Sequence, residues 1–254
     1  MQHSLNNDLQ NKSEIDTNWF ESWFDTPYYH ILYKDRDDTE AQFFMDTITQ
    51  YLNLPEDSTI LDLACGKGRH AIYLNEIGYD VVGYDLSEKS IAEASESEND
   101  KLHFKVHDMR KPFDKKFDAI FNLFTSFGYF ENDSDNLKTL ESIRDGLTEY
   151  GFGVIDFMNA DYVIENLVAE ETKVVDGITF EIKRIYDGEF IQKAIDFEDK
   201  GEKFHFTERV QALTLQKFEA MMQELDIDLI DIFGDYKLHK FSKKDSERLI
   251  MIFK

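Results

Sequence analysis

The chain has 254 residues, which is enough for one large domain or two small ones and for a sizeable hydrophobic core. Apolar residues make up 42% of the chain and charged residues 31%, with only 3 prolines and 12 glycines, so the composition is typical of a folded globular protein and excludes a fibrous or low-complexity one. Lysine and arginine number 28 against 52 aspartates and glutamates, and the net charge of −24 disfavours binding to nucleic acid or to an anionic membrane surface.

The cysteine content and the hydropathy pattern indicate the compartment. Cys65 is the single cysteine, so neither an internal disulfide nor a cysteine-based metal site is expected. The first residues lack a basic segment followed by an apolar one, and no later stretch approaches the roughly 18 apolar residues of a membrane span. We therefore expect a cytoplasmic protein without a bound metal and without a nucleic-acid or membrane partner.

The N-terminal segment is rich in aromatic residues. Residues 1–13 are polar and have no periodicity, which predicts a mobile tail. Over Glu14–Phe24 the aromatic residues recur at intervals of three and four, which predicts a helix, and a second helix is expected over Asp38–Leu52. Thr26–Tyr33 contains a proline and crowded aromatic residues, so we expect a connecting segment that packs against an apolar surface.

From Ile60 onward, short apolar runs alternate with helical patterns, which is typical of a parallel sheet wrapped by helices. Strands are expected over residues 60–64, 81–84, 102–106, 117–123 and 152–157. Helices are expected over residues 69–76, 88–94 and 134–147.

The last third of the chain changes character. Within residues 172–214, turn pairs such as Asp176-Gly177 separate stretches with two-residue alternation, which predicts an antiparallel meander. A helix near residues 215–225 and strands near 229–233 and 249–253 follow. The predicted organisation is an N-terminal helical cap (14–56), an α/β core (57–160 and 213–254) and a β insertion (161–212) that forms a substrate lid.

A strand that runs through a glycine-rich turn into a helix begins the α/β pattern, in Ile60-Leu-Asp-Leu-Ala-Cys-Gly-Lys-Gly-Arg-His-Ala71. Gly66 and Gly68 let the backbone pass close to a ligand, and the helix start offers unpaired N–H groups to it. Together with Ala71 they satisfy the G-x-G-x-x-G/A spacing of dinucleotide-binding folds, which is a weak signal by itself.

Three successive strand ends carry an aspartate. Asp62 lies within the first strand, where it would repel phosphates but suits a cationic ligand. Asp85 closes the next strand, near the distance from the glycine turn at which an acidic residue accepts ribose hydroxyls. Asp108 follows the third strand, and ligands of open parallel sheets bind at this edge. The pattern predicts a ribose-containing, cationic ligand.

In this combination the sequence resembles the class I methyltransferases that use S-adenosylmethionine (SAM). The resemblance spans about Thr59 to Phe157 and rests on Asp62-x-x-x-Gly66-x-Gly68, Asp85, Asp108-Met109 and Phe117-Asp-Ala-Ile-Phe-Asn122. It implies a Rossmann-like seven-stranded sheet whose last strand is antiparallel, and SAM as the cofactor.

The resemblance also implies roles for individual residues. Gly66 and Gly68 would pass beneath the methionine half of the cofactor, Asp85 would hold the ribose hydroxyls, and Asp62 would lie near the amino group. Asp108 with Met109 would frame the adenine, and the strand end at residues 122–124 would face the sulfonium. The cofactor-binding residues expected are Tyr33, Asp62, Ala64, Gly66, Gly68, Arg69, Asp85, Leu86, Asp108, Met109, Asn122, Leu123 and Phe124.

The acceptor pocket is expected between the N-terminal segment and the β insertion. In the family the N-terminal segment often closes over SAM, which makes Tyr29 and Tyr33 candidate lid residues. We further expect Phe127 to contact the acceptor and Arg209 to pair with an acceptor carboxylate, with a structural salt bridge as the alternative for Arg209. Methyl transfer depends mainly on positioning and on exclusion of water, so no catalytic base is named.

The acceptor is expected to be a small molecule methylated on nitrogen or oxygen. Asn122-Leu-Phe-Thr125 departs from the Asn-Pro-Pro-Tyr type of signature found in methyltransferases of adenine and glutamine amino groups. A methyltransferase acting on protein or RNA and a non-catalytic SAM-binding protein remain as alternatives. A nucleotide-dependent oxidoreductase is disfavoured, because Asp62 and Asp108 do not suit it.

Overall fold

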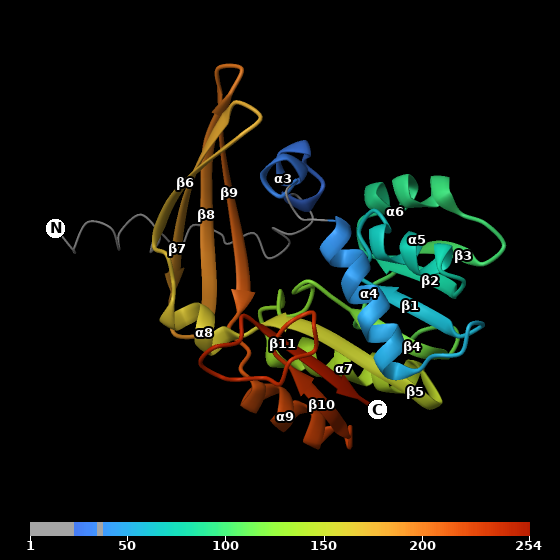
Figure 1. The fold of residues 1–254 in the computed structure, drawn as a ribbon. Helices are drawn as coiled ribbons and strands as arrows, with labels where there is room; N and C mark the ends of the chain where they lie inside the picture. The colour runs from blue at the N-terminus through green and yellow to red at the C-terminus, as the bar shows by residue number, and fades with distance from the viewer. Residues whose placement is uncertain (1–22, 35–37) are drawn as a thin grey trace.

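A computed structural model describes residues 23–34 and 38–254, which form two sheets and the helices around them (Figure 1). The larger sheet has seven strands in the order β10-β11-β5-β4-β1-β2-β3. Its strands are β1 (Thr59–Leu63), β2 (Asp80–Asp85), β3 (Leu102–Val106), β4 (Phe117–Asn122), β5 (Leu147–Met158), β10 (Leu229–Phe233) and β11 (Arg248–Phe253). Strands β1 to β5 are parallel, whereas β11 runs antiparallel to both β5 and β10. The predicted Rossmann-like sheet with an antiparallel last strand is therefore confirmed.

Helices cover both faces of this sheet because its central strands are apolar on both faces. Successive residues of β1 point to opposite sides, so that Ile60 and Leu61 belong to separate hydrophobic cores. One core is shared with α4 (Asp38–Leu52), α5 (Arg69–Glu76) and α6 (Glu88–Ala94), and α6 continues into a 3-10 turn at Ser95–Ser97. The other core is shared with α7 (Asp133–Gly146) and α9 (Leu215–Glu224).

The second sheet is an antiparallel meander in the order β6-β7-β8-β9 and projects from the larger sheet in Figure 1. Its strands are β6 (Glu170–Val175), β7 (Ile178–Tyr186), β8 (Phe190–Asp199) and β9 (Glu202–Gln211). Asp176 and Gly177 both have positive φ between β6 and β7, as the predicted turn requires. A short helix that the sequence pattern did not indicate, α8 (Ala160–Glu165), leads into this sheet.

The segment predicted to be an irregular connection, Thr26–Tyr33, is instead the helix α3 (Pro27–Leu32). The proline stands at the start of the helix, where its missing N–H costs nothing, and the Thr26 hydroxyl accepts a hydrogen bond from the backbone N–H of Tyr29 at 3.2 Å. The prediction was wrong because proline was taken as a break rather than as a start signal. The expected tail at residues 1–13 and most of the helix expected over Glu14–Phe24 lie outside the described residues.

Helix α3 (blue in Figure 1) lies between the second sheet and the helices of the larger one. Trp23 and Leu32 pack into the core of the second sheet, against Phe180 and Phe197 among others. The fold therefore places an aromatic segment from the start of the chain against strands that come about 150 residues later.

Within the described part of the chain, no helix is long and apolar enough to span a membrane.

Candidate active site

A cavity of about 1120 Å³ lies at the carboxyl ends of β1, β2 and β4 and beside the loop that follows β3. Parallel strands present their carboxyl ends at one edge, where ligands of open α/β sheets bind. Helix α3 and strand β9 supply the opposite wall. The predicted site residues that line it are Tyr29, Tyr33, Asp62, Ala64, Gly66, Arg69, Asp85, Leu86, Asp108, Met109, Leu123 and Phe124.

The two glycines after β1 serve different purposes. Gly66 has a φ of +54° and lines the cavity, and a Cβ atom added to it would meet nothing within 4 Å. Gly68 has a φ of +81°, but it is not among the lining residues, and a Cβ atom there would approach the Phe104 ring to 2.6 Å. The expectation that both glycines pass beneath a ligand is corrected for Gly68, whose lack of a side chain accommodates the packing of α5 on β3.

Asp85 joins the end of β2 to the turn after β1. Its Oδ2 accepts a hydrogen bond from the backbone N–H of Gly66 at 2.8 Å, and its Oδ1 accepts one from Ser87 at 2.9 Å. Burial raises the pKa of Asp85, and these backbone hydrogen bonds oppose the rise. A carboxylate has about four acceptor sites, so capacity remains for the two hydroxyls of a ribose.

Asp62 is a buried carboxyl that faces the cavity with one free oxygen. The residue is 2% exposed, and its Oδ2 has no hydrogen-bond partner among the described residues. Burial raises the pKa of Asp62 to about 7; the charge of Asp85 adds to the rise, whereas the Ala71 backbone and Arg69 oppose it. Since buried polar atoms are normally hydrogen-bonded, this oxygen fits a cationic donor such as an ammonium group.

Asp108 is held by an arginine that sequence reasoning missed. The Arg110 side chain donates to both carboxylate oxygens, from Nε at 2.9 Å and from Nη2 at 2.8 Å, and its backbone N–H donates at 3.0 Å. Although burial raises the pKa of Asp108, the hydrogen bonds and charge of Arg110 outweigh it and leave the pKa below its ordinary value. Asp108 is therefore an ionised hydrogen-bond acceptor in the loop after β3. The one sequence signal for Arg110 is that it lies two residues after Asp108.

The comparisons with known proteins agree with this geometry. Residues 60–151 match a family model described as a methyltransferase domain. The putative methyltransferase YqeM of Bacillus subtilis is 29% identical over 72% of this chain and 79% of that protein. Glycine/sarcosine N-methyltransferase of Halorhodospira halochloris is 26% identical over 79% of this chain and 76% of that protein. The crystal structure of a SAM-dependent methyltransferase from Clostridium acetobutylicum superposes with a TM-score of 0.76 at 21% identity, over 89% of this chain and 95% of that one.

Residues 60–151 thus form a methyltransferase domain, and the relatives and the superposed structure support a class I SAM-dependent methyltransferase. Its cofactor is SAM. The residues present fit this group, because a ribose would meet the carboxylate of Asp85 and an ammonium that of Asp62, and Gly66 leaves space beside them. Within the described residues, no group of three or more His, Cys, Asp or Glu side chains could hold a metal ion.

Besides Gly68, three more of the predicted contacts lie outside the cavity of this methyltransferase. Asn122 is fully buried and donates from Nδ2 to the Leu63 carbonyl at 3.0 Å, so it joins β4 to β1. Phe127 is buried in the core, with its ring centroid 5.5 Å from that of Phe218. Neither is among the residues that line the cavity.

Arg209 is the third of these residues. It pairs with Glu131, and its guanidinium carbon lies 3.3 Å from the centroid of the Phe190 ring. It does not line the cavity. The alternative of a structural salt bridge is the one observed, since alternation along β9 turns Arg209 to the opposite side from Glu208 and Val210, which do line the cavity.

The turn after β4 is held by a buried ion pair. Phe124 and Thr125 both have positive φ, 55° and 62°, a conformation that costs non-glycine residues about 1–3 kcal/mol each. The fully buried Asp156 accepts from the Phe124 backbone N–H at 2.9 Å and from Arg248 Nε at 2.8 Å, while its backbone carbonyl accepts from Thr125 at 3.0 Å. This network fixes Phe124 at the cavity, and sequence reasoning missed it because Asp156 and Arg248 come from β5 and β11.

The Phe124 ring in turn orders the start of α5. It stacks on the imidazole of His70, with centroids 4.8 Å apart and an interplanar angle of 6°. The guanidinium carbon of Arg69 lies 5.6 Å from the same ring centroid. Aromatic and cationic groups therefore meet where the strand end faces the cavity.

The wall opposite the strand ends is anchored at both ends of α3. At its start, Asp25 accepts from the Ser87 hydroxyl at 2.6 Å and its carbonyl accepts from Lys89 at 2.6 Å, which ties it to α6. At its end, the Tyr33 hydroxyl donates to Glu208 of β9 at 2.7 Å. Helix α3 thus bridges the cavity from the Asp85 side to the second sheet.

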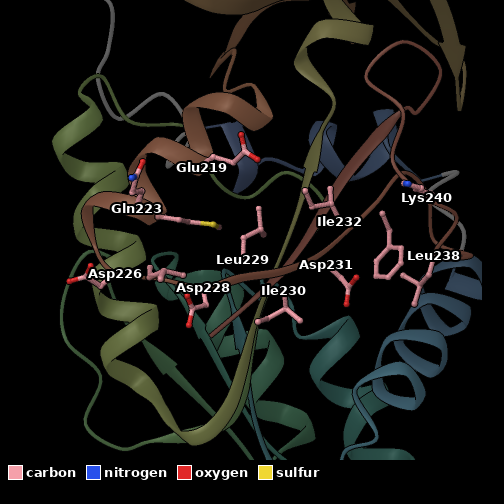
Figure 2. A pocket seen from close by; sticks show the side chains of 13 residues that line it. Glu219, Gln223, Asp226, Asp228, Leu229, Ile230, Asp231, Ile232, Leu238 and Lys240 are labelled. Carbon is pink, nitrogen blue, oxygen red and sulfur yellow. The ribbon is translucent and has the colours of Figure 1, made fainter.

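A second hollow, of about 1300 Å³, lies between α9 and the edge strand β10 (Figure 2). Figure 2 shows the acidic side chains Glu219, Asp226, Asp228 and Asp231 around it, with Lys240 at one end. It is wide open and shares none of the glycine-turn or strand-end residues. The residues predicted for the site line the first cavity and not this one.

Proposed function

We propose that the protein transfers a methyl group from SAM to a nitrogen of a small-molecule acceptor, with an oxygen acceptor as the alternative. The observation that carries this proposal is the partly open cavity of about 1120 Å³ between the strand ends and the wall made by α3 and β9. Cavities that enclose a single drug-sized ligand measure roughly 300–1,000 Å³, so the volume accommodates the cofactor and a compact acceptor together.

The relatives favour nitrogen. Two of them are glycine/sarcosine N-methyltransferases, from Halorhodospira halochloris and from Aphanothece halophytica, at 26% and 24% identity. A dTDP-amino-sugar N,N-dimethyltransferase of Streptomyces venezuelae is 32% identical over 40% of this chain. All three of these relatives are named as N-methyltransferases, and we extend that class of acceptor to this protein.

In this proposal the strand ends hold the cofactor. Asp85 accepts the ribose hydroxyls with the carboxylate capacity left by Gly66 and Ser87, and Asp62 accepts the amino group. Asp108 and Met109 frame the adenine. Gly66, which has no side chain, leaves room for the part of SAM that links its methionine and adenosine halves.

Catalysis then depends on positioning the reacting groups and on excluding water from the cavity. When bound, SAM supplies an electrophilic methyl group on a positively charged sulfur. The turn of Leu123 and Phe124, fixed by Asp156, lies at the strand end that faces this group, while α3 and β9 exclude water. We name no acid or base: an unprotonated acceptor nitrogen would attack through its lone pair, and the methylated product would lose its proton to bulk solvent after it leaves the cavity.

The test is a direct assay for S-adenosylhomocysteine (SAH) production with defined acceptors. The panel comprises glycine, sarcosine, a dTDP-amino sugar, a catechol as the oxygen acceptor, bulk RNA and a mixed protein extract. Turnover with an amine, at least tenfold above the rate without acceptor, is expected. Methyl transfer only to RNA or protein would refute the proposal, and so would SAH binding without transfer to any member of the panel.

A further inference from the structure

The loop after β3 and the start of α7 are joined by one arginine side chain. Arg110 lines the cavity together with Asp108 and Phe130. Its Nη1 donates to Asp135 Oδ2 in the first turn of α7 at 3.0 Å, and its guanidinium carbon lies 5.0 Å from the centroid of the Phe130 ring. These contacts are separate from the three hydrogen bonds that Arg110 makes with Asp108. The arginine is therefore held from several sides, and the Asp108 carboxylate is held with it.

The hydrogen bonds of Arg110 leave Asp108 with one open acceptor position. A carboxylate has about four lone-pair sites, two on each oxygen. Oδ1 accepts from both the backbone N–H and Nε of Arg110, whereas among the described residues Oδ2 accepts from Arg110 Nη2 alone. One site on Oδ2 thus remains for a ligand. The Asp108 side chain is only 15% exposed, so water has little access to that site.

Arg110 also determines what this open position can bind. It outweighs the effect of burial and keeps Asp108 ionised, and an ionised carboxylate accepts hydrogen bonds but donates none. Two parallel hydrogen bonds from one guanidinium fix the orientation of the carboxylate as well. The open position therefore suits an N–H donor at one place, and it repels a carbonyl oxygen at the same place because both groups are acceptors.

We propose that Arg110 is a positioning residue that makes the cofactor site selective for 6-aminopurines over 6-oxopurines. The inference rests on the proposed function, in which Asp108 and Met109 frame the adenine of SAM. The amino group of adenine can donate to the open position on Asp108, whereas hypoxanthine carries an oxygen there. Hypoxanthine also has an N–H on the neighbouring ring nitrogen, but Arg110 prevents the carboxylate from turning to accept it.

The test compares two ligands that differ only in the base. The protein is titrated calorimetrically with SAH and with S-inosylhomocysteine, in which a carbonyl oxygen replaces the amino group of adenine. The wild type should bind SAH at least tenfold more tightly than S-inosylhomocysteine. Equal affinities would overturn the inference.

Substitutions at Arg110 separate selectivity from a structural role. Arg110→Met removes the charge and the side-chain hydrogen bonds, so the ratio of the two affinities should fall at least fivefold. Arg110→Lys keeps the charge but cannot hold both oxygens of Asp108 in one plane, so its ratio should lie between those of the wild type and of Arg110→Met. A purely structural link between the loop and α7 would weaken both ligands equally. An unchanged ratio in either variant would therefore overturn the inference.

Two controls address the other contacts of the arginine and the substitution itself. Asp135→Asn removes the charge of the second partner but leaves the pair of Arg110 with Asp108, so its ratio should stay within twofold of the wild-type value. A ratio that falls as far as in Arg110→Met would show that the link to α7 is what matters, and the inference would be wrong. Arg184→Met breaks a pair with Glu171 in the second sheet, outside the cavity, and should leave both affinities unchanged. Thermal melting verifies that each variant folds.

The two proposals fail in different ways. A protein that methylates an amine of the panel but keeps the wild-type ratio in its Arg110 variants refutes this inference alone. A protein that selects SAH through Arg110 but methylates nothing in the panel refutes the proposed function alone.

Discussion

The carboxylate of Asp85 and the backbone N–H of Gly66, 19 residues apart in the chain, are joined by a hydrogen bond of 2.8 Å. Through this bond the end of β2 fixes the path of the glycine turn after β1. The two features that the sequence singles out for the cofactor are thus one mechanical unit, and a change at either should affect the other.

Replacing Asp85 by alanine should weaken SAH binding at least tenfold. The variant loses the proposed ribose hydrogen bonds, which are worth about 1.5–3 kcal/mol when one partner is charged, and it also releases Gly66. Isothermal titration measures the change. Asp85→Asn is the control, because it keeps the shape but removes the charge, and it should lie between the wild type and Asp85→Ala. Unchanged affinity in Asp85→Ala would rule out the ribose assignment.

Valine at the two glycines should produce different defects. Gly66→Val directs a side chain into open space at the cavity, so it should abolish SAH binding at a cost to folding of about 1–2 kcal/mol for the positive φ. Gly68→Val forces a side chain against Phe104 and should lower stability by more than that, with less direct effect on the ligand. Chemical denaturation and SAH titration distinguish the two. Adding Phe104→Leu should partly rescue Gly68→Val and should not rescue Gly66→Val.

Asp62 should make the ligand-free protein less stable as pH rises. Its pKa is raised by burial to about 7 from an ordinary value of 3.8, so the folded state holds a proton that the unfolded state has lost. Stability from this group is complete below pH 4 and is lost between about pH 4 and 7, by at most about 4 kcal/mol at 1.4 kcal/mol per pKa unit. Denaturation curves of the wild type and of Asp62→Asn between pH 4.5 and 7.5 should therefore converge toward low pH. Parallel curves would contradict the prediction.

The same carboxyl should release a proton when the ligand binds. If the SAH ammonium pairs with Asp62, the bound state favours the carboxylate, and calorimetric enthalpies near pH 6.5 should depend on the ionisation enthalpy of the buffer. Asp62→Asn is the matched control and should show a smaller buffer dependence. Identical buffer dependence in the two proteins would remove Asp62 from the amino-group site.

Breaking the buried pair of Asp156 and Arg248 should destabilise the fold and disturb the turn after β4. Removal of one partner from a buried ion pair costs roughly 3–5 kcal/mol, and Arg248→Met leaves Asp156 uncompensated. Thermal melting should show the loss. SAH affinity should fall as well, because Phe124 and Thr125 lose the contacts that hold their positive φ. If stability falls by the predicted amount but the folded fraction binds SAH with unchanged affinity, the conformation of the turn does not depend on the ion pair.

Local patterns in the sequence predicted much of the fold. Helix α5 begins and ends where its apolar spacing predicts, and β3 likewise, because these elements depend on residues close in sequence. The strand-end aspartates were found because parallel strands bring their carboxyl ends to one edge. Helix α3 was missed through a misinterpreted proline, although Thr26 and Pro27 form a recognisable start.

The remaining site residues could not be found in this way. Glu208 and Arg248 reach the cavity wall and the turn only through the pairing of β9 with β8 and of β11 with β5. Nothing near them in sequence marks them, whereas Asn122 and Phe127 stood next to a real motif and were assigned with it. Alternation along a strand decides which side each residue faces, and a shift of one residue separates Arg209 from Glu208.

The bridge that α3 makes between α6 and β9 has a consequence for how such an enzyme can diversify. The floor of the cavity, which we propose holds the cofactor, comes from one continuous stretch that includes β1, β2 and β4, while the opposite wall is assembled from the start of the chain and from a sheet added after β5. Substitutions in that wall can alter which acceptor is admitted without disturbing the groups proposed to hold SAM. Relatives that share the floor are therefore free to differ in what they methylate.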